Sequence, residues 1–128
     1  LSDTKDVPCT YSLNFRIRNS KLNMTVHMRS QDAIFGMGND APCFSFIHEM
    51  VYTELLAAYP DLEMGEYCHF ADSFHLYERH FEMLEALASD SPYLEVDCPK
   101  MVATEATSLI SQQFQPFNFT NWLTNFSK

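Results

Sequence analysis

The sequence lacks any hydrophobic run close to the roughly 20 residues that a membrane-spanning helix requires. Its first residues, Leu1–Asp6, are mostly polar and do not form the apolar core of a signal segment. These two absences argue against membrane insertion and export, and we expect a cytoplasmic protein.

Metal-binding and disulfide patterns are missing as well. No two cysteines form a Cys-x-x-Cys pair, and the histidines have none of the spacings of a zinc site. The cysteines are Cys9, Cys43, Cys68 and Cys98, and the histidines are His27, His48, His69, His75 and His80. We therefore interpret the cysteines as thiols and expect no metal centre and no disulfide framework.

Basic residues are scarce, because eight Lys and Arg stand against seventeen Asp and Glu, for a net charge of −9. Binding to a nucleic-acid polymer or an anionic membrane needs a basic surface, so we expect neither as a partner. A single arginine in a cleft can still bind one phosphate through its planar fork of donors. The composition is therefore compatible with a mononucleotide.

Alternating residues predict a β-hairpin near the N-terminus. Apolar and polar residues alternate over 11–18 and again over 22–29, the period of half-buried strands. Asn19, Ser20 and Lys21 between them are typical of a turn. The start of the first strand then lies beside the end of the second, so we expect Cys9 and Arg29 to meet.

The sequence has no repeats and no linkers, and we expect residues 1–128 to form one domain. A loop with Gly36 and Gly38 leads to a helix that ends before Tyr59, with Asp40 as a favourable N-cap. A short strand is expected over 66–71 and a helix over about 74–88, with His75 and Tyr77 on its first turn. From Tyr93 onward no clear period is present.

Three motifs are individually common and jointly rare: Pro8-Cys9, then Arg29-Ser30-x-Asp32-x-x-x-Gly36-x-x-x-Asp40, then His75-x-Tyr77. They combine a thiol nucleophile, an anion-binding Arg-Ser step and polar groups suited to a nucleotide. Each also has an ordinary structural interpretation. Cys9 could be a small buried residue, Asp32 and Gly36 turn residues, Asp40 only a helix cap, and His75 and Tyr77 residues of a helix start.

The order and spacing of these motifs resemble the C-terminal catalytic part of the thymidylate synthase superfamily, over about residues 6–84. Asp40 stands where synthases have Asn, and with Thr10 and Met28 it looks most like the deoxycytidylate hydroxymethylase branch. The resemblance implies an α/β (α+β) fold, with a bent mixed sheet packed against helices. It also implies that residues 1–128 form the C-terminal part of a catalytic domain whose N-terminal segment, with a catalytic Glu, is absent from this chain.

The resemblance implies a folate-dependent one-carbon transfer to C5 of a pyrimidine deoxynucleoside monophosphate, with 5,10-methylenetetrahydrofolate as co-substrate. Two other interpretations remain open: methylation of dUMP by a thymidylate synthase, or a noncatalytic dimerisation or interaction fragment of such an enzyme. The residues implied are Cys9 as nucleophile, Arg29, Ser30, Asp40, His75 and Tyr77 at the nucleotide, and Asp32 and Gly36 at the folate. Without the N-terminal segment we expect the fragment alone to be inactive.

Asp40 favours dCMP over dUMP in this interpretation. Cytosine offers an amino donor at C4, which a carboxyl group can accept, whereas uracil offers a carbonyl there, so that two acceptors would meet. The family pattern further implies a homodimer through the polar face of the hairpin. That face comprises Asn14, Arg16, Asn23, Thr25 and His27.

Overall fold

The computed structural model describes residues 7–90. The predicted hairpin is confirmed: β1 (Thr10–Arg18) and β2 (Lys21–Met28) pair antiparallel, with Arg18 opposite Lys21. The turn residues Asn19 and Ser20 have φ values of 52° and 59°. Two consecutive left-handed residues form the tight turn whose twist matches that of paired strands, so the hairpin closes in two residues.

The central sheet is three-stranded and mixed, in the order β1-β2-β4. Strand β4 (Glu63–Ala71) lies parallel to β2 and begins three residues before the strand expected from residue 66. The pairing shifts between Leu22 and Met24, where Gly65 lies so close to the Leu22 carbonyl that a Cβ atom would collide with it. A mixed sheet packed against a helix confirms the expected fold class.

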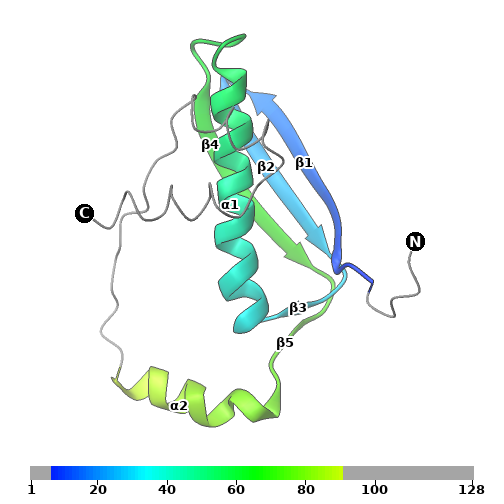
Figure 1. Ribbon diagram of the computed structural model, residues 1–128, viewed down its shortest axis with the longest axis vertical. Coiled ribbons are helices and arrows are strands. Elements are labelled where there is room, and N and C mark those ends of the chain that lie inside the picture. Colours follow the sequence, from blue (N-terminus) through cyan, green and yellow to red (C-terminus); the bar gives the residue numbers. More distant parts are fainter. Residues whose placement is uncertain (1–6, 91–128) are drawn as a thin grey trace, which may run out of the picture.

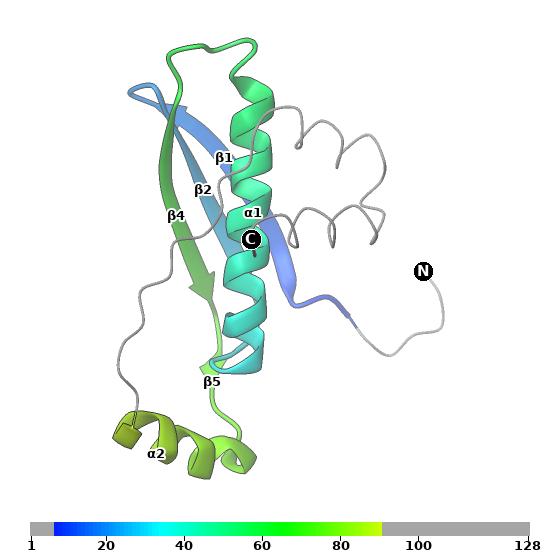
Figure 2. The same cartoon turned by 60° about the vertical axis from the view of Figure 1, so that its left-hand side comes forward.

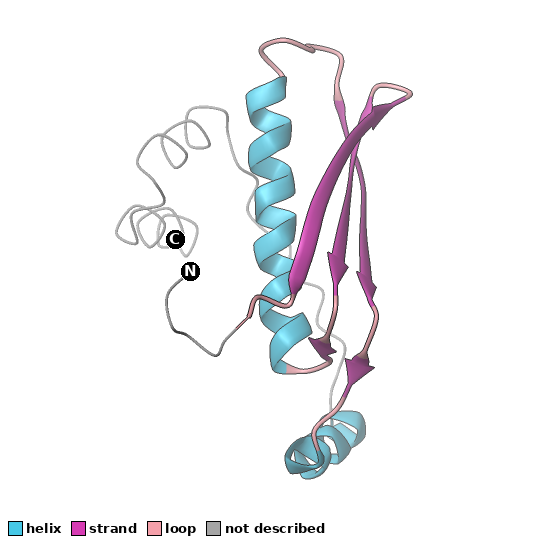
Figure 3. Cartoon of the chain, turned by 90° about the vertical axis from the view of Figure 1, so that its right-hand side faces the viewer, coloured by secondary structure: helices cyan, strands magenta, loops and turns pink. Residues whose placement is uncertain are grey.

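Helix α1 (Phe35–Leu55) connects the two parallel strands and covers one face of the sheet, as Figure 3 shows. The side chains of β2 that face it form the core with Phe44. Their exposed fractions are 1% for Leu22, 0% for Met24, 0% for Val26 and 4% for Met28. Alternation in β2 therefore places every second residue under the helix.

The predicted start of this helix is wrong. The helix begins at Phe35, so Gly36 and Gly38 lie inside it, and Asp40 is not the N-cap. The reason is Asp32, whose carboxylate accepts hydrogen bonds from the backbone N–H groups of Ile34 (3.2 Å) and Phe35 (3.3 Å) and so starts the helix earlier. The helix also ends at Leu55, before the expected stop at Tyr59.

The predicted helix over 74–88 begins later than expected. Residues Phe74–His75 form strand β5, which pairs parallel with β3 (Gln31–Asp32). Tyr77 is extended (φ −89°, ψ 136°), and only then follow the 3₁₀ turn η1 (Glu78–His80) and helix α2 (Phe81–Asp90). Pairing with β3 holds His75 in a strand, which the local sequence could not reveal.

Helix α2 projects beyond the end of the sheet (Figures 1 and 2). Apolar side chains of α2 are exposed, since Met83 and Leu87 are 38% and 54% exposed, whereas His80 of η1 is buried. None of the helices in the part of the chain described is long and apolar enough to cross a membrane. The segment from Tyr93 onward lies outside the described residues.

Candidate functional site

The strands β2 and β4 finish, and β1 begins, at the same end of the sheet (Figure 1). The Arg29 N–H donates to the Cys9 carbonyl at 2.9 Å, which confirms that the hairpin brings these residues together. Cys9 is half-buried and packs against the core cluster that contains Met28 and Phe44. Cys9 therefore packs against an apolar cluster on one side and lies beside the backbone of an exposed arginine.

The Arg29 guanidinium donates hydrogen bonds to the backbone just before Cys9. Its Nη2 donates to the Val7 carbonyl at 2.9 Å and its Nε to the Pro8 carbonyl at 3.3 Å. These bonds fix the segment that precedes Cys9. Among the described residues, no hydrogen bond joins the guanidinium to the thiol. Arg29 and Cys9 therefore meet through their backbones. The remaining guanidinium donors are available to an anion.

Strands β3 and β5 join the second and third motifs. Asp32 lies opposite His75, and the Ala33 N–H donates to the His75 carbonyl at 2.9 Å. Gln31 N–H likewise donates to the Ser73 carbonyl at 2.8 Å. Ser30, half-buried, comes directly before this pairing. Residues that are more than forty positions apart in the sequence therefore form one polar edge.

Asp32 is ionised and accepts backbone hydrogen bonds at the start of helix α1. Partial burial acts to raise the pKa of its carboxyl, but the backbone N–H groups of Ile34, Gly36 and Phe35, together with nearby His80, lower it, and the pKa lies below the ordinary value. The two carboxylate oxygens offer about four acceptor sites in all, so these three backbone groups leave at least one site free. The group can therefore bond the backbone before α1 and accept a hydrogen bond from a ligand at the same time.

Asp40 lies in the second turn of α1, half-buried, and contacts Gln31. The Gln31 Nε2 donates to Asp40 Oδ2 at 2.9 Å. Gly36 provides the room for this bond, because a Cβ atom there would lie 2.9 Å from Nε2. Gln31 was not identified from the sequence, since it occupies an unspecified position of the Arg-Ser-x-Asp motif and nothing in its local pattern marks it.

Tyr67 and His69 of β4 were also missed, although alternation in the predicted strand puts both on one face. The Tyr67 hydroxyl lies 2.6 Å from His69 Nδ1. Burial first, then the neighbouring Asp40 and Cys43, raise the pKa of Tyr67 to about 12. Tyr67 therefore stays protonated at neutral pH, and its hydroxyl can donate a hydrogen bond to His69.

His75 and Tyr77 lie together with their rings perpendicular and 5.0 Å apart. Arg79 covers Tyr77, with the guanidinium carbon 4.4 Å from the ring centroid, and donates from Nε to His80 Nε2 at 3.1 Å. His80 is 7% exposed and meets the Phe35 ring edge-on at 4.9 Å. The His/Tyr pair is thus held against the start of α1 by a cation–π contact and a buried histidine.

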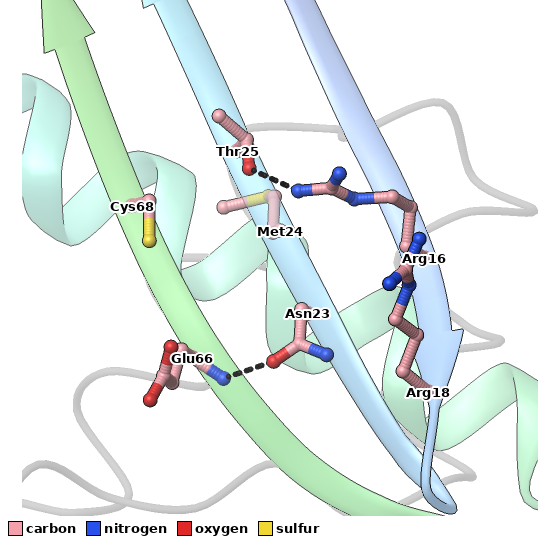
Figure 4. Close-up of a pocket in the computed structure, with 7 residues that line it drawn as sticks. All are labelled: Arg16, Arg18, Asn23, Met24, Thr25, Glu66 and Cys68. Atoms are coloured by element: carbon pink, nitrogen blue, oxygen red, sulfur yellow. Dashed lines mark hydrogen bonds between the residues drawn. The ribbon is translucent and has the colours of Figure 1, made fainter.

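A hollow of about 250 Å³ lies elsewhere, on the face of the sheet turned away from α1 (Figure 4). Its polar lining includes Arg16, whose Nη2 donates to the Thr25 hydroxyl at 3.3 Å, and Asn23, whose Oδ1 accepts from the Glu66 N–H at 2.9 Å. This hollow belongs to the polar face predicted from the hairpin. Within residues 7–90, no group of three or more His, Cys, Asp or Glu side chains could hold a metal ion.

Comparison with known proteins gives a family match and a fold match. The sequence matches the family described as thymidylate synthase over residues 1–125. In structure, the chain resembles a thermostable thymidylate synthase A from Bacillus subtilis, with a TM-score of 0.57 and 25% identity, over 68% of this chain and 30% of the other.

Curated relatives include both hydroxymethylating and methylating enzymes. A deoxyuridylate hydroxymethyltransferase of Bacillus phage SP01 is 39% identical over 59% of this chain, and a deoxycytidylate 5-hydroxymethyltransferase of Enterobacteria phage T6 is 32% identical over 62%. A thymidylate synthase of Francisella philomiragia is 26% identical over 90% of the chain. The chain spans 19%, 33% and 39% of these three relatives, respectively.

Proposed function

Because the chain belongs to the thymidylate synthase family, we propose that the protein transfers a one-carbon unit to C5 of a pyrimidine deoxynucleoside monophosphate. The preferred substrate is dCMP, and the product is the 5-hydroxymethyl nucleotide. The observation that carries this choice is Asp40. Relatives that are named for deoxyuridylate and for deoxycytidylate both match this chain, so the base is argued from the residue at this position.

The Asp40 carboxylate fits cytosine better than uracil. It already accepts a hydrogen bond from Gln31 on one oxygen, and its half-buried position gives it a partly desolvated surrounding. The cytosine amine donates to a carboxylate, whereas the uracil carbonyl would face it acceptor to acceptor. An unpaired buried group costs about 1–3 kcal/mol, which corresponds to about tenfold to a hundredfold discrimination.

The remaining residues take complementary roles in the proposal. The Cys9 thiolate adds to C6 of the pyrimidine, which makes C5 nucleophilic, and leaves again after C5 has taken the one-carbon unit and lost its proton. Arg29 and Ser30 bind the phosphate, and His75 and Tyr77 bind the sugar. Arg29 suits this role because it is exposed and uses only some of its donors on Val7 and Pro8.

The folate side of the site is formed by Asp32 and Gly36. Asp32 fits a ligand with N–H donors, because it is ionised and its carboxylate keeps at least one free acceptor site. The co-substrate 5,10-methylenetetrahydrofolate supplies the one-carbon unit. Loss of the C5 proton would expel tetrahydrofolate and leave a methylene group on C5. Water adding to this methylene, with elimination of the Cys9 thiolate, would give the hydroxymethyl product, whereas hydride transfer from the tetrahydrofolate, which becomes dihydrofolate, would give the methyl product of a thymidylate synthase.

The test is release of tritium from C5-labelled dCMP and dUMP, with methylenetetrahydrofolate, by the longest natural form of the protein. We expect release from dCMP to be at least about tenfold faster, and we expect mass spectrometry to identify the hydroxymethyl product. Cys9→Ser should abolish release while nucleotide binding persists, as when a covalent step alone is lost. A methyl product would support the thymidylate synthase alternative instead.

Asp40→Asn should move the preference toward dUMP, because the amide can donate to the uracil carbonyl. The matched control is Asp61→Asn, the same change at an exposed turn residue far along the chain. A wild type that prefers dUMP, or an unchanged preference in Asp40→Asn, would contradict the assignment of dCMP.

We also propose that two copies associate through the polar face of the sheet that carries the hollow of Figure 4. On this face Phe70 is 57% exposed and stacks on His27 with ring centroids 5.4 Å apart. Phe70→Asp should therefore weaken the dimer in sedimentation experiments, whereas Tyr59→Asp, at a 51% exposed aromatic residue in a turn, should not. A monomeric wild type at micromolar concentration would refute the dimer.

A further inference from the structure

Gln31 is the most deeply buried polar side chain at the site, with 2% of its surface exposed. It begins β3, where its N–H is bonded to the Ser73 carbonyl, and its amide reaches back under the first turns of α1. There Nε2 donates to Asp40 Oδ2 at 2.9 Å. The contact links the strand that follows the phosphate-binding motif to the residue that faces the base.

The other end of this amide is left unsatisfied. Gln31 Oε1 is buried and has no hydrogen-bond partner among the described residues. A buried acceptor without a donor destabilises a fold, and an apolar side chain of similar size would avoid this loss. The presence of glutamine at this position is therefore better explained by what Nε2 does for Asp40 than by packing.

The charge of Asp40 fixes the orientation of the amide. An ionised carboxylate only accepts hydrogen bonds, so the NH₂ group of Gln31 must face it and the carbonyl must face away. Rotation of the amide by half a turn would place two acceptors 2.9 Å apart. Within residues 7–90, Oδ2 is the only Asp40 oxygen that accepts a hydrogen bond, so Oδ1 remains for a ligand.

Gly36 keeps the arrangement in place. A Cβ atom at this position would lie 2.9 Å from Gln31 Nε2 and 3.2 Å from Asp32 Cβ. Gly36 is one helical turn before Asp40, on the same side of α1. The absence of a side chain there lets the amide pass between the strand and the helix.

We propose that Gln31 is a positioning residue for base selection. It occupies Oδ2 of Asp40, holds the carboxylate in one rotamer and presents Oδ1 to the exocyclic amine of cytosine. This role rests on the proposed function, since it concerns the same base. The proposal assigns the selectivity to two residues, Gln31 and Asp40. A carboxylate that is free to rotate would accept the hydrogen bond of the cytosine amine in only part of its rotamers.

The test measures dissociation constants of dCMP and dUMP by calorimetry on the full chain in its longest natural form. The variants are Gln31→Met, which has similar length and no donor, Asp40→Ala, and the double variant. We expect Gln31→Met to lower the dCMP preference by about fivefold or more, in line with the loss of a hydrogen bond to a charged group. In the Asp40→Ala background, the same substitution should change the preference by less than about twofold.

A merely structural role gives a different pattern. If Gln31 only supports the fold, Gln31→Met weakens both nucleotides equally, in both backgrounds, and the ratio stays that of the wild type. That result overturns the proposal. A wild type without any dCMP preference overturns the proposed function itself, whereas a normal wild-type preference with an unchanged ratio in Gln31→Met overturns only the role of Gln31.

Gln31→Glu provides a second variant, which also serves if Gln31→Met does not fold. Two adjacent carboxylates share a proton at low pH, so that the new group can donate to Asp40 Oδ2, and they repel each other at high pH. We expect the dCMP preference to approach the wild-type value at pH 5 and to be lost at pH 8. The nucleotide and the neighbouring Asp32, Cys43, Tyr67 and His69 can also titrate, so the preference of the variant is divided by that of the wild type at each pH. If this quotient does not change with pH, the proposal is contradicted.

Discussion

Gly36 and Gly38 lie two residues apart in the same helix and should respond oppositely to the same substitution. Neither has a positive φ, so alanine fits the backbone at both positions. Around Gly38 no atom outside the neighbouring helix backbone lies within 4 Å of the place a Cβ would occupy, whereas at Gly36 the Gln31 amide lies at 2.9 Å and Asp32 Cβ at 3.2 Å. The pair therefore separates helix propensity from crowding at the site.

The expected magnitudes follow from these distances. Gly38→Ala should raise the free energy of unfolding by about 0.5–1 kcal/mol, because alanine restricts the unfolded chain and favours the helix. Gly36→Ala gains the same benefit at most, but Gln31 is 2% exposed and has little room to move, so crowding should cost about 1–3 kcal/mol. The two variants should then differ by roughly 1–3 kcal/mol.

Chemical denaturation of both variants beside the wild type measures this difference. The slope of the free energy against denaturant concentration should stay constant, so that the midpoints report stability directly. Gly36→Ala should also reduce the dCMP preference, since it displaces the amide that holds Asp40, while Gly38→Ala should leave the preference unchanged. Equal stabilisation by both substitutions would refute the close approach of Gln31 to Gly36.

Three further predictions concern the scaffold. His48 is 3% exposed, and burial, only partly opposed by its bond to a backbone carbonyl, lowers its pKa. The unfolded state therefore binds a proton more readily, so stability should fall as the pH drops below about 6.5, and urea midpoints of His48→Gln should show a weaker decline. Gly65→Ala should lower the free energy of unfolding by about 1–3 kcal/mol, because the new Cβ meets the Leu22 carbonyl; wild-type stability of this variant would contradict the bulge geometry. Met24→Ala, at a side chain with 0% exposure, should cost about 2–5 kcal/mol in denaturant titrations, whereas Met64→Ala, at 39% exposure, should cost under about 1 kcal/mol; similar losses would place the core elsewhere.

Elements that depend on neighbouring residues were predictable from the sequence. The hairpin follows from alternation and from a turn whose residues tolerate positive φ, and it alone brings Arg29 to Cys9. The joint spacing of the motifs likewise led to the family, which the match over residues 1–125 confirms. The roles of the individual site residues stay predictions.

Elements that depend on partners far along the chain were not predictable. Residues 74–75 have no local feature that marks a strand, and they form β5 only because β3 offers a free edge to pair with. The start of α1 was misplaced for a related reason, since the Asp32 carboxylate bonds the backbone of Ile34 and Phe35 before the glycines that looked like a loop. In both cases, backbone N–H and C=O groups are paired with partners that the local sequence does not specify.

The chemistry of the site divides in the same way. The sequence by itself determined which reactive groups are present, including the thiol of Cys9, the guanidinium of Arg29 and a carboxylate at residue 40. Only the tertiary structure decided what each group faces: the guanidinium holds the Val7 and Pro8 carbonyls, and Asp40 meets the amide of Gln31. The type of a side chain is a local property, but its hydrogen-bond partners are fixed by the packing of β3 under α1, which local patterns do not encode.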